Sequence, residues 1–203
     1  MTNRDAAIPH QRSLFPQPKG PAVPDGLRYQ ADLINEIEER DLADALGTLP
    51  LKPFEFHGHL GNRRVVSFGL RYDYSRAAVE SADEPPHFLD PLRIKIAKFA
   101  GREVQEFRQI GINEYRPGAG IGWHRDKPQF DVIVGVSLLS PVKMRFRKRD
   151  AKGWMRASQI LAPRSVYILD GEARKVWEHS IAPVSSLRYS ITFRTLANET
   201  AGC

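Results

Sequence analysis

Six short segments with the composition of β-strands follow one another between residues 64 and 194. They are rich in β-branched and aromatic residues, and turn sequences such as Arg-Pro-Gly-Ala-Gly and Asp-Ala-Lys-Gly lie between them. The segments are 64–74, 109–115, 132–138, 143–149, 165–170 and 188–194. Many short strands separated by turns bury their apolar faces by packing as a sandwich or barrel. The sequence therefore predicts an α+β fold with such a core.

Two helices are expected, at 34–50 and 90–104. Asn35 is a candidate N-cap for the first helix, and Gly47 is expected to end it. Asp90, followed by proline, is expected to open the second. The residues expected to face the core are Ile37, Leu42 and Leu46 in the first helix and Leu92, Ile96 and Phe99 in the second.

Residues 1–26 are expected to form a disordered tail, because five prolines interrupt a segment with little apolar periodicity. Residues 27–203 then form a single domain. The sequence contains no apolar run long enough to span a bilayer, and the N-terminus lacks the apolar core of a signal peptide. Cys203 is the only cysteine, which excludes a disulfide framework and a thiolate metal site. We expect a monomeric, cytoplasmic protein without a membrane partner.

The chain carries a formal charge of +6 and has a sequence pI of about 9.6. This excess is compatible with binding a polyanion such as nucleic acid, but many basic proteins bind none.

His124 and Asp126 stand two residues apart, after a glycine-rich turn and before an apolar strand. On a strand such residues share a face, so an imidazole and a carboxylate can converge on one metal ion. His179 is a candidate third ligand. Two histidines and one carboxylate make the facial triad that holds Fe(II) and leaves three positions open. A surface His–Asp pair and a packed strand histidine are the structural alternatives.

The segment 188–194 places two arginines on one face and apolar residues on the other. Arg188 and Arg194 share the polar face with Ser190, and a buried guanidinium needs an anion. Inside a barrel this pattern describes a receptor for a dicarboxylic acid, whereas on an edge strand it has no such meaning. Asn113 and Tyr115 likewise share one face and can supply hydrogen bonds.

These pieces occur in a fixed order: Asn-x-Tyr, Pro-Gly-x-x-Ile, His-x-Asp, Gly-Glu-Ala-Arg before a histidine, and Arg-x-Ser-x-Thr-Phe-Arg. In this order and spacing the chain, from about residue 60 to 196, resembles the AlkB family of Fe(II)/2-oxoglutarate dioxygenases. The resemblance implies a double-stranded β-helix (jelly-roll) core with supporting helices. It implies Fe(II), 2-oxoglutarate and O2 as cofactor and cosubstrates.

The resemblance also assigns residues by position. It makes His124, Asp126 and His179 the catalytic iron ligands. Arg188 would bind the distal carboxylate of 2-oxoglutarate and Arg194 would lie near its metal-chelating end. The full set of implied 2-oxoglutarate contacts is Asn113, Tyr115, Ile121, Arg188, Ser190 and Arg194.

The segment at about 54–76 stands where the family keeps its nucleotide-recognition lid. Candidates to stack on an extruded base are Phe68, Tyr72 and Tyr74, with a core role as the alternative. Arg64, with Arg63, is a candidate phosphate contact. In 143–149 alternate basic residues share a face, which a solvated edge strand explains better than a phosphate track. Arg149 is the candidate contact there.

The resemblance implies oxidative demethylation or dealkylation of alkylated bases in DNA or RNA, as in DNA repair. A hydroxylase of tRNA, of a protein side chain or of a small molecule uses the same scaffold and is an alternative. A non-catalytic binding module is the alternative of another class. The complete triad and the two arginines favour the enzyme.

Overall fold

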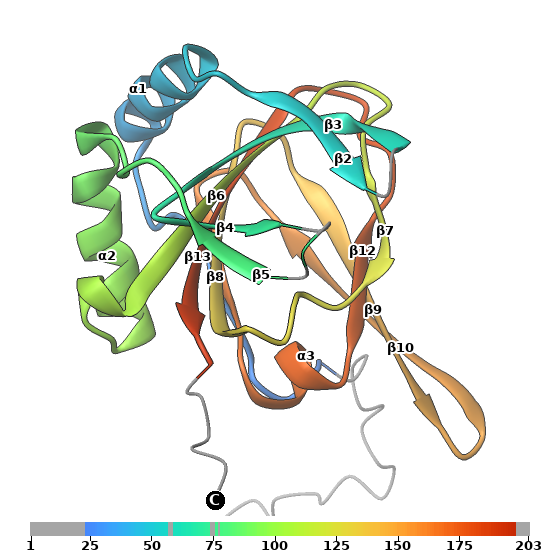
Figure 1. The fold of residues 1–203 in the computed structure, drawn as a ribbon. Coiled ribbons are helices and arrows are strands. Elements are labelled where there is room, and N and C mark those ends of the chain that lie inside the picture. Colours follow the sequence, from blue (N-terminus) through green and yellow to red (C-terminus); the bar gives the residue numbers. More distant parts are fainter. Residues whose placement is uncertain (1–22, 57–58, 74–75, 77, 198–203) are drawn as a thin grey trace, which may run out of the picture.

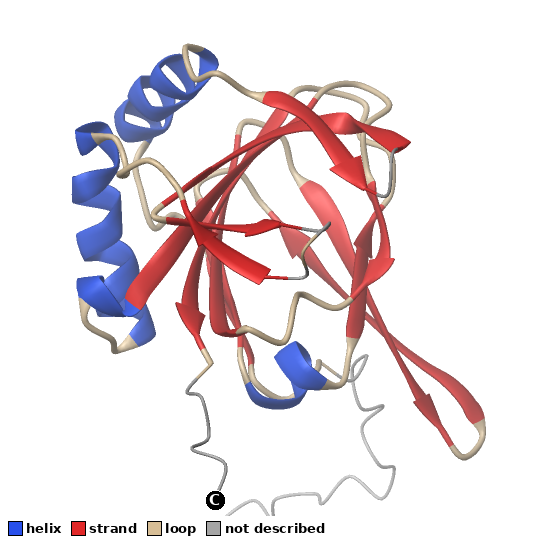
Figure 2. Cartoon of the chain, in the orientation of Figure 1, coloured by secondary structure: helices blue, strands red, loops and turns tan. Residues whose placement is uncertain are grey.

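The computed structural model describes residues 23–56, 59–73, 76 and 78–197, and shows two antiparallel sheets that face each other (Figures 1 and 2). The major sheet has seven strands in the order β1-β11-β8-β13-β6-β3-β2. Their bounds are β1 Leu27–Gln30, β11 Ser165–Leu169, β8 Phe130–Leu138, β13 Arg188–Leu196, β6 Phe107–Tyr115, β3 His59–Phe68 and β2 Lys52–Phe56.

The minor sheet has four strands in the order β10-β9-β12-β7. Their bounds are β10 Gly153–Leu161, β9 Val142–Asp150, β12 Glu178–Ile181 and β7 Ile121–His124. A separate two-stranded ribbon, β4 Leu70–Asp73 with β5 Ala78–Ser81, lies in front of the barrel strands in the view of Figure 1. The arrangement is the jelly roll expected of the α+β class.

Two helices pack on the outer face of the major sheet (Figure 2). These are α1, Glu36–Gly47, and α2, Asp90–Ala100; the short elements are η1 His87–Leu89, η2 Val104–Glu106 and α3 Gly171–Lys175. As predicted, Asn35 caps α1, and its side chain accepts hydrogen bonds from the backbone of Ile37 and Glu38. No helix in the described part of the chain is long and apolar enough to cross a membrane.

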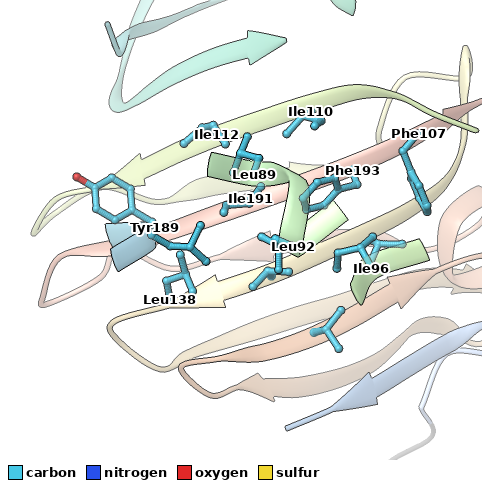
Figure 3. Close-up of a cluster of buried hydrophobic side chains, with 14 of the residues drawn as sticks. Leu89, Leu92, Ile96, Phe107, Ile110, Ile112, Leu138, Tyr189, Ile191 and Phe193 are labelled. Carbon is cyan, nitrogen blue, oxygen red and sulfur yellow. The ribbon is translucent and has the colours of Figure 1, made fainter. Parts of the chain in front are cut away.

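Strand β13 separates two environments because its side chains alternate between its faces. Tyr189, Ile191 and Phe193 join the helix residues Leu92 and Ile96 in the outer core (Figure 3). A second buried cluster lies between the sheets and includes residues of β8, β9, β11 and β12. The other face of β13, which carries the two arginines, is therefore directed into the space between the sheets.

Two predictions about these elements are wrong. The segment 64–74 is not one strand, because Gly69 turns the chain at φ +71° between β3 and β4. Ile37 does not face the core; its side chain is 62% exposed. Glu39 is buried in its place, where its carboxylate accepts hydrogen bonds from the backbone of Leu139 and from Arg164. The predicted tail falls mainly on residues 1–22, which lie outside the described residues.

Candidate iron and 2-oxoglutarate site

A cleft with a volume of about 980 Å³ opens between the two sheets. Strands of both sheets contribute to its walls. Among the predicted site residues, those that line it are Tyr72, Asn113, Tyr115, Ile121, His124, Asp126, His179, Ser190 and Arg194. The volume lies at the upper end of the range typical of small-molecule sites.

The predicted metal ligands meet at this cleft because β7 and β12 are neighbours. His124 of β7 pairs with His179 of β12, and their ring centroids are 4.3 Å apart. Asp126 follows two residues after the end of β7, and its Oδ2 lies 3.5 Å from Nε2 of His179. One ligand atom from each of the three residues lies within 4.8 Å of the other two. The sequence-predicted triad is thus a single cluster.

The protonation states of this cluster suit a divalent cation. Burial raises the pKa of Asp126, but the positive charge of Arg194 is the largest of several opposing effects, which together hold the pKa well below its usual range. Burial lowers the pKa of His179 well below its usual range, and His124 adds to this effect. A neutral imidazole and an ionised carboxylate are the forms that bind metals.

His124 is oriented by its own strand. Its Nδ1 lies 2.9 Å from the backbone oxygen of Gly122. A tautomer with the proton on Nδ1 donates to that oxygen and leaves Nε2 free as a ligand. Two imidazoles and one carboxylate, with no thiolate, match the donor set of a non-haem Fe(II) centre. These residues fit the metal.

Arg188 provides independent evidence for an anionic ligand. Its side chain is completely buried, and its Nε donates to Oγ of Ser137 at 3.1 Å. Its guanidinium lies 5.0 Å from the centre of the Tyr115 ring, and both Nη atoms are buried without a hydrogen-bond partner among the described residues. A buried cation in this state is costly unless an anion completes it. The distal carboxylate of 2-oxoglutarate fits this requirement, because it accepts two parallel hydrogen bonds from a guanidinium.

Arg194 lies at the metal end of the cleft. Its Nη2 donates to Oδ1 of Asp126 at 3.0 Å, and its Nη1 donates to Oε1 of Gln109 at 2.6 Å and to Oγ1 of Thr192 at 2.9 Å. These contacts fix the guanidinium beside the ligand carboxylate. The role of Arg194 near the chelating end of the cosubstrate stays a prediction.

Sequence reasoning missed Tyr167, which lines the cleft from β11. It stands opposite Gly135 of β8, where a Cβ atom would lie 2.2 Å from the Tyr167 ring. The glycine inside the apolar run 132–138 was the available signal, since such a glycine marks close approach. Burial raises the pKa of Tyr167 to about 12. Its neutral phenol can therefore donate a hydrogen bond in the cleft.

Arg174, in the Gly-Glu-Ala-Arg motif, was not assigned a role either. It is buried, and its Nη2 donates to the backbone oxygens of Lys127 at 2.5 Å and Phe130 at 2.6 Å. Lys127 lies in the loop that follows Asp126, and Phe130 is the residue at which that loop enters β8. Arg174 thus holds that loop against α3 and fixes the position of the ligand carboxylate.

The predicted substrate residues separate into different surroundings. Phe68 is 6% exposed and belongs to the outer core, so its predicted stacking role is wrong. Arg64 is not among the residues that line the cleft; it donates to Glu114 at 3.2 Å and to the backbone of Leu51 at 2.8 Å. Tyr72 lines the cleft. Tyr74 lies outside the described residues.

Arg63 was predicted together with Arg64 as a phosphate contact, and of the two it is Arg63 that lies at the cleft. It lines the cleft, where its Nη1 donates to Oδ1 of Asn113 at 3.2 Å. Its guanidinium lies 4.0 Å from the centre of the Phe54 ring. The two neighbouring arginines differ because consecutive residues of a strand such as β3 point to opposite faces of the sheet.

Comparison with known proteins agrees with this geometry. The model of the 2OG-Fe(II) oxygenase superfamily matches residues 28–194. The mouse protein named tRNA (carboxymethyluridine(34)-5-O)-methyltransferase ALKBH8 is 30% identical over 171 residues, which cover 80% of this chain and 25% of the mouse protein. The Arabidopsis thaliana protein named Alkylated DNA repair protein ALKBH8 homolog is 28% identical over 214 residues, covering 88% of this chain and 60% of the relative.

A solved structure, that of OsALKBH1, has the same fold. Its TM-score is 0.61 at 15% sequence identity, and the match covers 86% of this chain and 98% of that one. The chain spans only a quarter of the mouse relative and 60% of the Arabidopsis relative. The family match, however, includes both sheets, all three candidate iron ligands and both arginines. The chain belongs to the 2OG-Fe(II) oxygenase superfamily and, within it, to the AlkB family.

Proposed function

We propose that this protein is an Fe(II)- and 2-oxoglutarate-dependent dioxygenase that oxidises an alkyl group on a nucleic-acid base. The observation that carries the proposal is a facial triad in the cleft together with a fully buried arginine, Arg188, which packs against the cleft residue Tyr115 and whose Nη atoms have no partner among the described residues. A protein that only binds a metal does not need the buried arginine. A protein that only binds a carboxylate does not need the triad.

Five residues of the site have a defined task in this function. His124, Asp126 and His179 would hold Fe(II), which, with 2-oxoglutarate and O2, supplies oxidative decarboxylation and C–H hydroxylation. Arg194 keeps the Asp126 carboxylate ionised and in place. Arg188 would bind the distal carboxylate of the cosubstrate and so set its orientation.

Two observations support nucleic acid as the substrate. The cleft is bordered by cationic and aromatic side chains: Arg63, Arg71, Tyr72, Trp123, Arg125 and Lys127. The Lys127 amine lies 4.8 Å from the centre of the Tyr72 ring, so an aromatic face and a cation stand together at this border. Such a border suits a base that enters the cleft with its phosphates outside. The printed names of the two relatives concern tRNA and alkylated DNA, so both polymers belong in the test.

The test is a screen for 2-oxoglutarate consumption coupled to product formation. The iron-loaded protein is given methylated DNA and RNA oligonucleotides, tRNA and methylated peptides, with Asp126→Ala as the control. We expect succinate and oxidised base in equal amounts with a nucleic acid, and neither with the control. Turnover with a peptide alone would overturn the nucleic-acid assignment, and the absence of turnover with any substrate class would overturn the oxygenase.

A further inference from the structure

The outer face of the minor sheet carries a row of arginines that the cleft does not use. In β9, Met144 and Phe146 are buried between the sheets, so Arg145, Arg147 and Arg149 are directed outward. The prediction that this segment is an edge strand is wrong. Strand β9 is hydrogen-bonded to β10 on one side and to β12 on the other.

Two tryptophans connect these arginines to the cleft. The Arg145 guanidinium lies 5.2 Å and the Arg147 guanidinium 4.4 Å from the centre of the Trp123 ring, and Trp123 itself lines the cleft. Arg147 also lies 4.4 Å and Arg149 4.8 Å from the centre of the Trp154 ring. We call these five residues the arginine–tryptophan ladder. It runs from the cleft border outward along the β9–β10 hairpin, which projects beyond the barrel (Figure 1).

The ladder has a surplus of positive charge. Arg156 of β10 stands directly opposite Arg147 and adds another cation. On the outward face of the four described strands, Glu178 is the single carboxylate, and it accepts from Nε of Arg147 at 2.6 Å. Like charges on adjacent strands repel each other and lower stability. Such an arrangement is relieved when a polyanion binds.

The arginines retain free hydrogen-bond donors. Arg145 uses its Nε to donate to Oγ of Ser180 at 3.1 Å. Within the described part of the chain, the Nη atoms of Arg145, Arg147, Arg149 and Arg156 have no hydrogen-bond partner. Stacking on an indole fixes the plane of a guanidinium and leaves its edge available, which is the geometry that binds phosphate.

We propose that the arginine–tryptophan ladder, with Arg156, binds the phosphate backbone of a nucleic-acid strand whose target base lies in the cleft. The identity of the ligand rests on the proposed function. Arg145 and Arg149 are four residues apart, a separation of about 13 Å along a strand. The ladder therefore contacts several consecutive phosphates on one side of the target. It makes binding depend on strand length beyond the base that enters the cleft.

The experiment compares charge reversals on two sides of the molecule. Arg149→Glu/Arg156→Glu alters the hairpin. Arg40→Glu/Lys98→Glu is the matched control: Arg40 of α1 and Lys98 of α2 are exposed, and both helices lie on the side of the molecule opposite the hairpin (Figure 1). The probe is a fluorescein-labelled, unmodified single strand of about 15 nucleotides, as DNA and as RNA, near the upper limit of what a single-strand-binding domain covers. Fluorescence anisotropy measures affinity between about 50 and 200 mM salt.

We expect the hairpin variant to bind roughly tenfold or more weakly than the control at the lower salt concentration. Loss of two phosphate contacts should also reduce the slope of log affinity against log salt by about 1.4. Arg149→Gln/Arg156→Gln, which removes charge without reversing it, should give a smaller loss of the same sign. Melting temperatures measured on all variants show that the hairpin remains folded.

Equal affinities and equal salt slopes for the hairpin and control variants would overturn the ladder. This result is distinguishable from failure of the proposed function. If the hairpin variant loses affinity while no nucleic acid is ever oxidised, the ladder stands and the oxygenase assignment to nucleic acid fails. If a nucleic acid is oxidised but the hairpin variant binds like the control, the proposed function stands and the ladder fails.

Discussion

Arg188 is the residue whose surroundings say most about the ligand. It is fully buried, its stem packs in the barrel, and its Nη atoms have no partner in the described structure. A buried charge held without a counter-charge lowers the stability of the protein that carries it. A folded protein tolerates this cost where function needs the charge. An anionic ligand that pairs with Arg188 should therefore raise the stability of the protein.

Replacement of Arg188 by methionine should separate stability from binding. Methionine fills most of the same space without a charge, so we expect Arg188→Met to be as stable as the ligand-free parent or more stable by about 1–4 kcal/mol. The same variant should show no rise in melting temperature when 2-oxoglutarate is added. Urea unfolding and thermal shift measure the two effects. A strongly destabilised variant would show that Arg188 is paired in the folded protein.

His179 should make the metal-free protein sensitive to acid. Because burial lowers its folded pKa, the unfolded chain takes up a proton below about pH 6.5 that the folded protein does not. The unfolded state then binds more protons, so stability falls as the pH falls, by about 1.4 kcal/mol per pH unit from this residue. Urea unfolding of the metal-free protein at pH 7.5 and 5.5 should show a larger loss than His179→Asn does. If the parent and His179→Asn lose the same unfolding free energy between the two pH values, the side chain of His179 is exposed to solvent in the folded protein.

Arg174 should affect the metal although it does not contact it. Its Nη2 holds the loop after Asp126 through two backbone oxygens. We expect Arg174→Gln to weaken Fe(II) or Mn(II) binding by about 10–100-fold, the range typical of residues that orient metal ligands. Arg174→Lys, which retains the charge but not the fork, should be intermediate. Unchanged metal affinity in Arg174→Gln, measured by anaerobic calorimetry, would limit Arg174 to a role in folding.

At the scale of elements, the β3–β4 region shows how one glycine separates two aromatic side chains that a continuous strand would place together. Gly69 turns the chain, so Phe68 ends β3 in the outer core while Tyr72 of β4 lines the cleft. A continuous strand through 64–74 places Phe68, Tyr72 and Tyr74 on the same face. The bend instead puts Phe68 in the outer core and Tyr72 at the cleft.

Two substitutions should distinguish these roles. Phe68→Ala should lower the free energy of unfolding by about 3–5 kcal/mol, as expected for a buried aromatic residue. Tyr72→Ala should leave the melting temperature nearly unchanged and weaken oligonucleotide binding by roughly five- to a hundredfold if its ring stacks on a base. Thermal melting and fluorescence anisotropy check both. If Phe68→Ala weakened oligonucleotide binding and Tyr72→Ala lowered the stability, the two assignments would be wrong.

The elements that could be predicted are those whose pattern is local. The alternation of β13 identifies both its core face and its arginine face, and the capping box identifies the start of α1. The elements that could not be predicted depend on distant partners. Glu39 is buried because residues 100 and more positions away supply its hydrogen bonds, and Ile37 is exposed in consequence. Strand β10 has exposed and half-buried residues that sequence patterns do not separate from a loop.

The same distinction applies to the site. The iron ligands were predictable because two come from one short motif and the third from a motif with a known order. Tyr167 was not, because every residue of β11 is buried and no alternation marks the one that enters the cleft. Arg174 was not, because its role is visible only in the loop oxygens that it binds.

At the scale of the whole molecule, the two sheets arrange three groups of residues in a row from the inside of the barrel to the outside. The triad and Arg188 lie between the sheets, Tyr72 and Arg63 lie at the cleft, and the arginine–tryptophan ladder continues outward along the hairpin. The helices cover the other face of the major sheet and take no part in this row (Figure 2). If the two proposals hold, the chemistry takes place inside the barrel, the base is recognised at its opening and phosphates bind beyond it.

The central claim is that the triad and Arg188 together form one site for Fe(II) and 2-oxoglutarate. Anaerobic calorimetry of 2-oxoglutarate binding tests it, using the iron-loaded protein, His124→Ala and Arg188→Lys. We predict one 2-oxoglutarate per chain, bound only when iron is present. Arg188→Lys should lower the affinity about tenfold or more, because lysine cannot replace a bidentate guanidinium. Undiminished 2-oxoglutarate binding in both variants would contradict the claim.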